Sequence, residues 1–192
     1  KNFDPELLRP AAESVRAGGI VAFPTETVYG LGVNLEDPEA VRRLLAMRKS
    51  PEGRAITVHI ADREDVRRHM KGELPVMAQR LIRKYWPGPL TLLVGEDDAL
   101  VGLRLPDHPI ARALIRAAGV SVGAPSANRK GEAPATDAGR VQEIFGGELD
   151  WIVDGGACRH STASTIVRVR NDGMEIIREG AIPRQEVDRA RA

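Results

Sequence analysis

The sequence predicts an α/β fold in which helices flank a twisted, mixed β-sheet, and it predicts one domain over residues 1–192. Apolar runs with strand character alternate with amphipathic helical patterns along the chain. No linker, internal repeat or change of composition divides it. Its 192 residues, 42% of them apolar, are enough for one sizeable core.

The first half of the chain mixes both kinds of element. Asp4 and Pro5 open a helix that Gly18 and Gly19 end, and Pro10 disfavours regular helix in its first turns. After it the patterns predict a strand at 20–23, a polar loop at 23–32, a helix opened by 37–39, a strand at 56–60, and helices near 62–70 and 75–85.

The second half is richer in strands. The sequence WPGP at 86–89 must end the preceding helix, because it holds two prolines. The patterns then predict strands at 90–94 and 101–105, a helix from 107 to 118, a strand at 120–122, a loop at 125–136, a helix capped by Thr136 that ends near 145, strands near 151–153, 164–169 and 174–177, and a final helix.

Composition and charge exclude several classes of protein. A net charge of +1 gives no overall field for nucleic acid or membrane. The chain has no run of about 20 apolar residues for a membrane span and no signal-peptide core at its N-terminus. Its lone cysteine, Cys158, cannot form an internal disulfide. We therefore expect a soluble, cytoplasmic protein with no membrane partner.

The common catalytic motifs are missing. The sequence has neither GxxxxGK[ST] nor GxGxxG, the two best-known nucleotide-binding fingerprints. It also lacks HExxH, GxSxG and any cluster of Cys and His, so we expect neither a zinc site nor a catalytic nucleophile. The remaining candidates are polar clusters in loops that leave strands, where α/β folds place ligands.

The first cluster is FPTETVYGLG, residues 23–32. Thr25, Glu26, Thr27 and Tyr29 offer hydroxyls and a carboxylate that could hold a small zwitterion. The alternative is a capped turn with Tyr29 packed in the core.

The second cluster is RKSPEGR, which holds Arg48, Lys49 and Arg54. Three cations at a turn suit a phosphate clamp. Basic residues are also expected at the solvated C-terminus of a helix, so that alternative stays open.

The third cluster surrounds Arg104, which lies inside an apolar strand. A buried guanidinium requires an anionic partner, either an internal Asp or Glu or a ligand carboxylate. Separately, His59 on a predicted strand could reach a ligand, or could be an ordinary core histidine.

The fourth cluster is GAPSANRKG, with Ser126 and Asn128 in a tight loop. Its backbone N–H groups could form an anion nest, or the loop could be a simple Asx or Ser turn. Ser164, where a strand begins, and Arg178, where one ends, belong either to the site or to the fold. Together the clusters indicate an anion-binding α/β protein.

Six motifs in order make the chain similar to a known family. It resembles the threonylcarbamoyl-AMP synthases, or YrdC/Sua5-like family, in its single-domain form. The motifs are FPTETVYGLG, WPGPLTLLV, VGLRLPDHP, APSANRKG followed by Thr136, STIV, and IIREGAI, and they span about residues 20–182.

The resemblance implies a YrdC-like fold and a nucleotidyl transfer. The family joins L-threonine, bicarbonate and ATP into threonylcarbamoyl-AMP and diphosphate, for the t6A modification of tRNA. ATP would be a substrate and Mg2+ would screen its phosphates. Positioning and charge stabilisation would carry the catalysis, so no catalytic nucleophile is implied. Implied partners are tRNA, through a surface for double-stranded RNA, and the threonylcarbamoyl-transfer machinery.

The resemblance also implies roles for single residues. The residues implied to hold L-threonine are Thr27, His59, Arg104, Ser126 and Ser164. The residues implied on the ATP side are Arg48, Lys49, Arg54, Asn128, Thr136 and Arg178.

One departure from the family concerns its Lys-x-Arg-Pro motif. Counting back from ITVHI, Arg48 falls at the Lys position and Ser50 replaces the Arg. Lys49 or Arg54 would then restore the missing charge. The departure leaves open a divergent RNA-binding relative with weak or altered ATP chemistry. A related carbamoyl-transfer domain of hydrogenase maturation is a third alternative, but the zinc-finger cysteines of those proteins are missing here.

Overall fold

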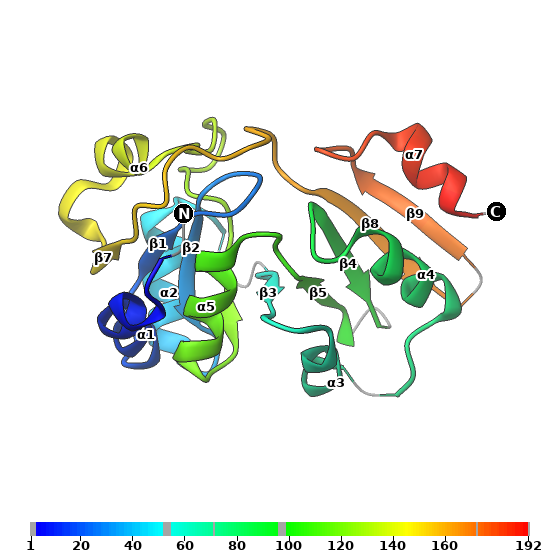
Figure 1. Ribbon diagram of the computed structural model, residues 1–192, viewed down its shortest axis with the longest axis horizontal. Coiled ribbons are helices and arrows are strands. Elements are labelled where there is room, and N and C mark those ends of the chain that lie inside the picture. Colours follow the sequence, from blue (N-terminus) through cyan, green and yellow to red (C-terminus); the bar gives the residue numbers. More distant parts are fainter. Residues whose placement is uncertain (1–2, 52–54, 71, 96–98, 172, 192) are drawn as a thin grey trace.

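A computed structural model describes residues 3–51, 55–70, 72–95, 99–171 and 173–191, and the following account concerns these residues. Their architecture is a twisted, mixed sheet with helices packed on it (Figure 1), which confirms the predicted fold class. No helix in these ranges is both long enough and apolar enough to span a membrane.

Helices and strands alternate along the described chain. The α-helices are α1 Arg9–Arg16, α2 Pro38–Met47, α3 Val66–His69, α4 Val76–Tyr85, α5 Pro109–Ala118, α6 Ala138–Phe145 and α7 Arg184–Asp188. The 3-10 helices are η1 Pro5–Leu8, η2 Arg63–Asp65, η4 Gly146–Glu148 and η5 Arg189–Arg191. The strands are β1 Val21–Phe23, β2 Gly30–Asn34, β3 Val58–His59, β4 Leu90–Val94, β5 Val101–Arg104, β6 Val122–Gly123, β7 Trp151–Ile152, β8 Thr165–Arg170 and β9 Gly173–Arg178.

Within the described residues the sheet has nine strands in the order β7-β1-β2-β6-β3-β5-β4-β8-β9. The pairs β1–β7, β3–β5 and β4–β8 are parallel, and the other pairs are antiparallel. Strands β1 and β2 therefore lie far from β8 and β9 in the sheet order. The segment after β7 runs from one end of the sheet to the other before β8 begins (Figure 1).

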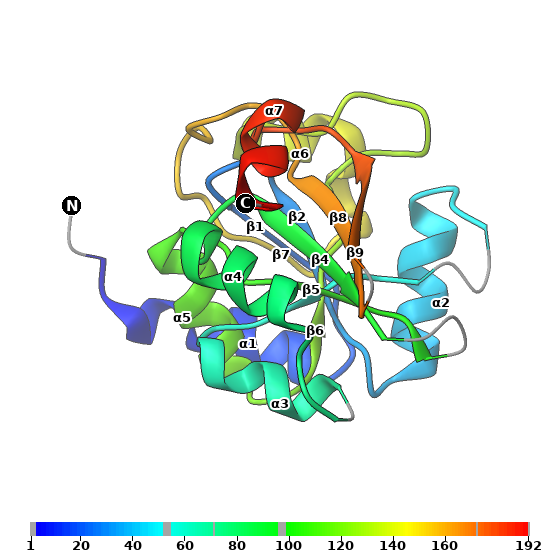
Figure 2. The same ribbon diagram turned by 90° about the vertical axis from the view of Figure 1, so that its right-hand side faces the viewer.

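Both faces of β1 are covered, because its side chains alternate between two apolar clusters. Val21 and Phe23 pack with α1 and α5, whereas Ile20 and Ala22 pack with α2 and α6. A third cluster packs α4 and α7 against β4, β5 and β8 (Figure 2). Burial on both faces explains the continuous apolar run at 20–23.

Strand β2 corrects the loop predicted at 23–32. Gly30, Leu31 and Gly32 are buried and pair with β1, with Phe23 opposite Gly30 and Val21 opposite Gly32. Glycine disfavours strands by propensity. Here it is accommodated because a Cβ on Gly32 would lie only 2.9 Å from the ring of Phe23.

Several predicted boundaries are also corrected. The helix over 62–70 is a 3-10 turn followed by the single turn of α3, and the strand over 56–60 is reduced to β3. Thr136 does not cap α6: the cap is Asp137, whose carboxylate accepts a hydrogen bond from the N–H of Arg140 at 2.8 Å. Carboxylates are good N-caps and favour the positive end of a helix.

Candidate functional site

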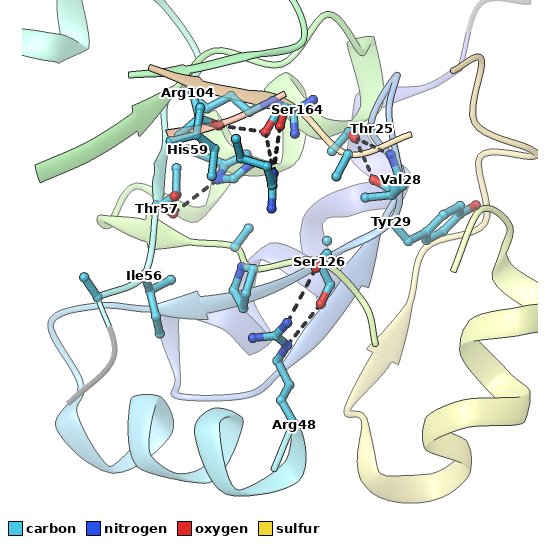
Figure 3. Close-up of a pocket in the computed structure, with 18 of the residues that line it drawn as sticks. Thr25, Val28, Tyr29, Arg48, Ile56, Thr57, His59, Arg104, Ser126 and Ser164 are labelled. Carbon is cyan, nitrogen blue, oxygen red and sulfur yellow. Dashed lines mark hydrogen bonds between the residues drawn. The ribbon is translucent and has the colours of Figure 1, made fainter. Parts of the chain in front are cut away.

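A pocket opens where the β1–β2 loop, the end of α2 and strands β3, β5 and β8 converge (Figure 3). Its volume is about 130 Å³, which exceeds the ~10–15 Å³ needed for one water and leaves room for a small molecule. The polar side chains that line it are Thr25, Tyr29, Arg48, Thr57, His59, Thr91, Arg104, Ser126, Ser164 and Arg178.

The β1–β2 loop forms one wall and is built as a capped turn. Thr25 Oγ1 donates to the carbonyl of Val28 at 2.6 Å and accepts from the N–H groups of Thr27 and Val28. Tyr29 is buried, donates its hydroxyl to the carbonyl of Gly156 at 2.9 Å, and has a pKa raised to about 12, mainly by burial. The turn alternative is therefore confirmed, and the turn also presents Thr25 and Tyr29 to the pocket.

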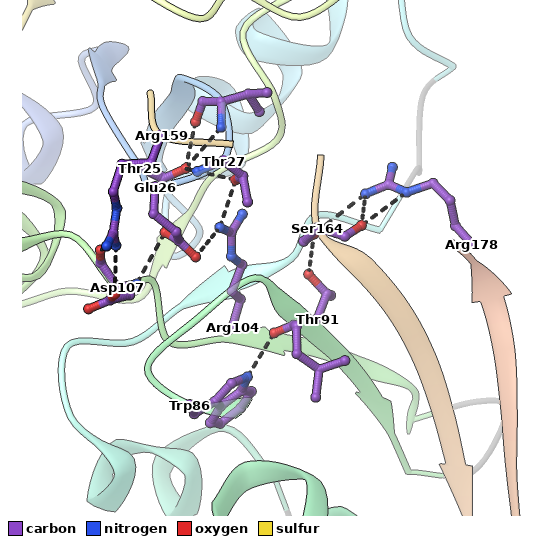
Figure 4. Close-up of polar contacts among 12 residues, drawn as sticks. Thr25, Glu26, Thr27, Trp86, Thr91, Arg104, Asp107, Arg159, Ser164 and Arg178 are labelled. Carbon is purple, nitrogen blue, oxygen red and sulfur yellow. Dashed lines mark hydrogen bonds and ion pairs between the residues drawn. The ribbon is translucent and has the colours of Figure 1, made fainter. Parts of the chain in front are cut away.

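Arg104 finds its acid within the protein. Its Nη2 donates to Glu26 Oε1 at 2.8 Å and to Thr27 Oγ1 at 2.7 Å (Figure 4). The Nε atom is buried with no hydrogen-bond partner among the described residues. One edge of the guanidinium is thus fixed by the β1–β2 loop, while the residue itself lines the pocket.

His59 lies beside Arg104 in the parallel β3–β5 register. Burial, together with the charge of Arg104, lowers the pKa of His59 to about 3, although a contact with the Thr57 carbonyl opposes the shift. Nδ1 lies 3.3 Å from that carbonyl, which favours the tautomer that carries its proton on Nδ1. The imidazole is neutral at physiological pH and contributes hydrogen bonding rather than charge.

Arg48 is the C-cap of α2 and reaches across to the fourth cluster. It is buried, and its Nε donates to the carbonyl of Ser126 at 3.1 Å. Longer contacts join Nη1 to Ser50 Oγ at 3.3 Å and Nη2 to Ser126 Oγ at 3.5 Å. Arg48 is therefore a built part of the pocket, and the solvated helix end is the wrong interpretation for it.

Lys49 is different, because it is exposed and does not line the pocket. Its φ of 52° is left-handed, and the N–H groups of Lys49 and Ser50 bond to the carbonyls of Ala46 and Leu45. This is the Schellman arrangement that ends many helices, usually with glycine at the left-handed position. Arg54, the other predicted replacement for the missing cation, lies outside the described residues.

Ser164 joins the two halves of the site. Its hydroxyl lies 2.8 Å from that of Thr91 on β4, and both side chains are buried. Arg178 at the end of β9 donates Nη2 to the Ser164 carbonyl at 2.7 Å. These contacts bring the C-terminal hairpin to the same pocket as the β1–β2 loop (Figure 4).

The remaining predicted residues lie off the pocket. Thr27 is fully buried behind it, bonded to Arg104 and Thr25. Asn128 accepts from Ser126 Oγ at 2.6 Å and donates to the carbonyls of Arg129 and Glu132, so it organises its own loop. Thr136 is half-buried and is also absent from the lining. Contact of these three with a ligand stays a prediction.

Two residues that line the pocket, Thr57 and Thr91, were not predicted from the sequence. Thr91 places a buried hydroxyl in the apolar strand LTLLV. A polar residue at a core position could have indicated that it belongs to a site. Thr57 precedes β3 and lines the pocket beside His59. Glu26 is a candidate from the sequence, but its pairing with Arg104 comes from packing that no local pattern contains.

The charges of the pocket define a class of protein. Three arginines line it, and no carboxylate does so among the described residues. Guanidinium groups beside serine and threonine hydroxyls are suited to carboxylate and phosphate oxygens. The fold and the site are therefore those of an α/β protein with a pocket lined by arginines and hydroxyl groups.

Comparison with known proteins identifies the family. Residues 13–180 match the Sua5–YciO–YrdC family model, described as "Telomere recombination". A protein of Bacillus subtilis (strain 168) named threonylcarbamoyl-AMP synthase is 37% identical over 96% of this chain and 56% of its own length. The chain belongs to the Sua5–YciO–YrdC family.

Two solved structures share the fold. That of Pyrococcus abyssi Sua5 complexed with L-threonine has a TM-score of 0.92 and 34% identity, covering 99% of this chain and 58% of that one. E. coli YciO has a TM-score of 0.84 and 25% identity, covering 97% and 95%. The chain thus spans little more than half the length of the Bacillus and Pyrococcus proteins.

Proposed function

We propose that this chain carries the L-threonylcarbamoyladenylate synthase activity, which makes threonylcarbamoyl-AMP and diphosphate from L-threonine, bicarbonate and ATP. The main support is the pocket, which Arg48, Arg104 and Arg178 line together and which no carboxylate lines among the described residues. The names of the relatives and the threonine complex of the Pyrococcus protein support this assignment.

The reaction has two bond-forming steps. The threonine amine attacks the carbon of bicarbonate and gives up a proton, and loss of water leaves a carbamate. A carbamate oxygen then attacks the α-phosphorus of ATP as the bond to the bridging oxygen breaks, and diphosphate leaves. We propose that a Mg2+ ion travels with the triphosphate, which supplies its oxygen ligands.

The chain's own residues would act by holding and by charge stabilisation. Arg104 would take the threonine carboxylate, with neutral His59, Ser126 and Ser164 around the amino acid. Arg48 and Arg178 would face the phosphates, where a preorganised guanidinium stabilises charge that develops in the transition state. The product would pass to adenosine in tRNA through other proteins of the t6A machinery.

The test is diphosphate release from ATP by the purified chain, with threonine and bicarbonate each omitted in turn. Release that requires both supports the synthase. Intact ATP under all conditions would contradict it. An Arg104→Met variant serves as the inactive control, since it removes the proposed carboxylate ligand.

Ser50 favours a second candidate. It stands where the family usually carries Arg, and its hydroxyl contacts Arg48 instead of adding a cation. A relative with weak ATP chemistry that binds double-stranded RNA would fit this loss. Salt-sensitive tRNA binding, unchanged by threonine and without ATP cleavage, would support that function.

A further inference from the structure

The side chain of Glu26 does not line the pocket, yet it is bonded to a side chain that does. Its Oε1 accepts from Arg104 Nη2 at 2.8 Å, and its Oε2 accepts from the backbone N–H of Asp107 at 3.1 Å. The two side chains are almost fully buried, with 1% of Glu26 and 6% of Arg104 exposed. Both oxygens of this carboxylate are therefore fixed by the protein (Figure 4).

This anchorage uses only part of Arg104. A guanidinium carries five N–H donors, and Nη2 gives its two to Glu26 and Thr27. Nε is buried without a partner among the described residues, and Nη1 makes no hydrogen bond to them either. A buried charged donor without an acceptor is costly, and a ligand oxygen in the adjoining pocket would satisfy it.

We propose that Glu26 is a positioning residue for the substrate carboxylate. It holds Arg104 by Nη2, so that an unused N–H, on Nε or on Nη1, stays available for one carboxylate oxygen in the pocket. A guanidinium that is already oriented loses little rotational freedom when it binds a ligand, and that raises affinity. The inference rests on the proposed function, because it takes L-threonine as the occupant.

The charge of Glu26 also bears on which ligand fits beside Arg104. The carboxylate neutralises the guanidinium, and His59 next to them is uncharged because burial and Arg104 lower its pKa to about 3. This part of the pocket is net neutral, which suits a zwitterionic amino acid. Arg48 lies across the pocket, where its Nε donates to the carbonyl of Ser126 (Figure 3).

The experiment measures the binding of L-threonine, L-threoninamide and ATP by calorimetry. Glu26→Ala removes the anchor, and Glu26→Gln keeps one oxygen in its place. Asp62→Ala is the matched control, because Asp62 also pairs with two arginines, Arg112 and Arg116, but lies outside this pocket.

We expect Glu26→Ala to weaken L-threonine about tenfold, which is about 1.4 kcal/mol, and Glu26→Gln to weaken it less. ATP affinity should change by less than about twofold. L-Threoninamide lacks the carboxylate, so the ratio of the affinity for L-threonine to that for L-threoninamide should also fall about tenfold in Glu26→Ala. General loosening of the fold would lower the affinities together and leave that preference unchanged.

Two outcomes would overturn the inference alone. One is a folded Glu26→Gln or Glu26→Ala variant with the original preference for the carboxylate, and the other is an equal loss of threonine and ATP affinity. If Glu26→Ala fails to fold, the preference of Glu26→Gln for L-threonine over L-threoninamide decides whether the inference holds. If the unaltered chain binds no threonine at all, the proposed function falls, and this inference falls with it.

Discussion

His59 on β3 lies opposite Arg104 on β5, and both side chains line the same pocket. Burial and the neighbouring guanidinium lower the pKa of His59 to about 3. In the unfolded chain a histidine has a pKa of about 6.5. The folded protein therefore binds fewer protons than the unfolded chain between these two values.

This difference predicts an acid-sensitive fold. Because the unfolded state binds the extra proton, the free energy of unfolding should rise with pH between about 3 and 6.5 and fall as acid is added. The contribution of His59 is at most ~1.4 kcal/mol per pH unit. Burial also lowers the pKa values of His69 and His108, so they act in the same direction.

The check is urea unfolding at pH 4.5 to 7.5 for the unaltered chain and for His59→Asn. Asparagine cannot take up a proton, so the slope against pH should be smaller in the variant. Equal slopes would show that His59 is protonated in the folded protein as readily as in the unfolded one.

Arg48 and Lys49 are neighbours with opposite surroundings, which predicts different effects on ATP. Arg48 lines the pocket, whereas Lys49 is exposed and does not. Arg48→Ala should raise the KM for ATP at least about tenfold, and Lys49→Ala should leave it within about twofold, since each lost ion-paired contact is worth ~1–3 kcal/mol. Kinetics of diphosphate release measures both. A larger effect from Lys49→Ala would assign the phosphate contact to Lys49.

The left-handed backbone of Lys49 predicts a stabilising substitution. A non-glycine residue at φ 52° is strained, and the Schellman turn after α2 requires that conformation. Lys49→Gly should raise the free energy of unfolding by ~1 kcal/mol. Lys49→Ala is the control, because it removes the same charge without relieving the strain. Equal midpoints in urea for the two variants would contradict the argument.

The glycines of β2 predict a graded loss of stability. A Cβ at Gly32 would lie 2.9 Å from Phe23 Cε1, whereas one at Gly30 has its nearest neighbour, Ala124 Cβ, at 3.4 Å. Gly32→Ala should therefore cost ~1–3 kcal/mol by overpacking, and Gly30→Ala should cost less. Thermal unfolding of the two variants gives the order, and a reversed order would show that the ring of Phe23 moves aside freely.

Much of the fold follows from local patterns. The apolar run 90–94, the Asp37 cap of α2 and the prolines after α4 each place an element correctly. Strand β2 could not be found in this way, because its Gly-Leu-Gly sequence lacks strand propensity. Its stability comes from tertiary contacts with β1, Phe23 and α2, which no local window contains.

The sequence predicts which chemical groups the site contains better than it predicts which residues contact one another. Arg104 inside an apolar strand required an acid, but Glu26 lies far away in sequence, and only the packing of the β1–β2 loop on β5 identifies it. The family resemblance implied that Thr27 holds L-threonine and that Asn128 lies on the ATP side, and both stay predictions. In the structure their polar atoms are used to hold other residues.

Thr25 comes from the N-terminal end of the chain and Arg178 from its C-terminal hairpin, yet both face one cavity. Closing so long a loop costs conformational entropy. Only the contacts made when β8 and β9 dock offset this cost, which favours slow folding. The pocket is consequently absent from any folding intermediate that lacks β8 and β9. During synthesis, the complete pocket would form only after β8 and β9 leave the ribosome, so ligand binding would report the docking of this hairpin.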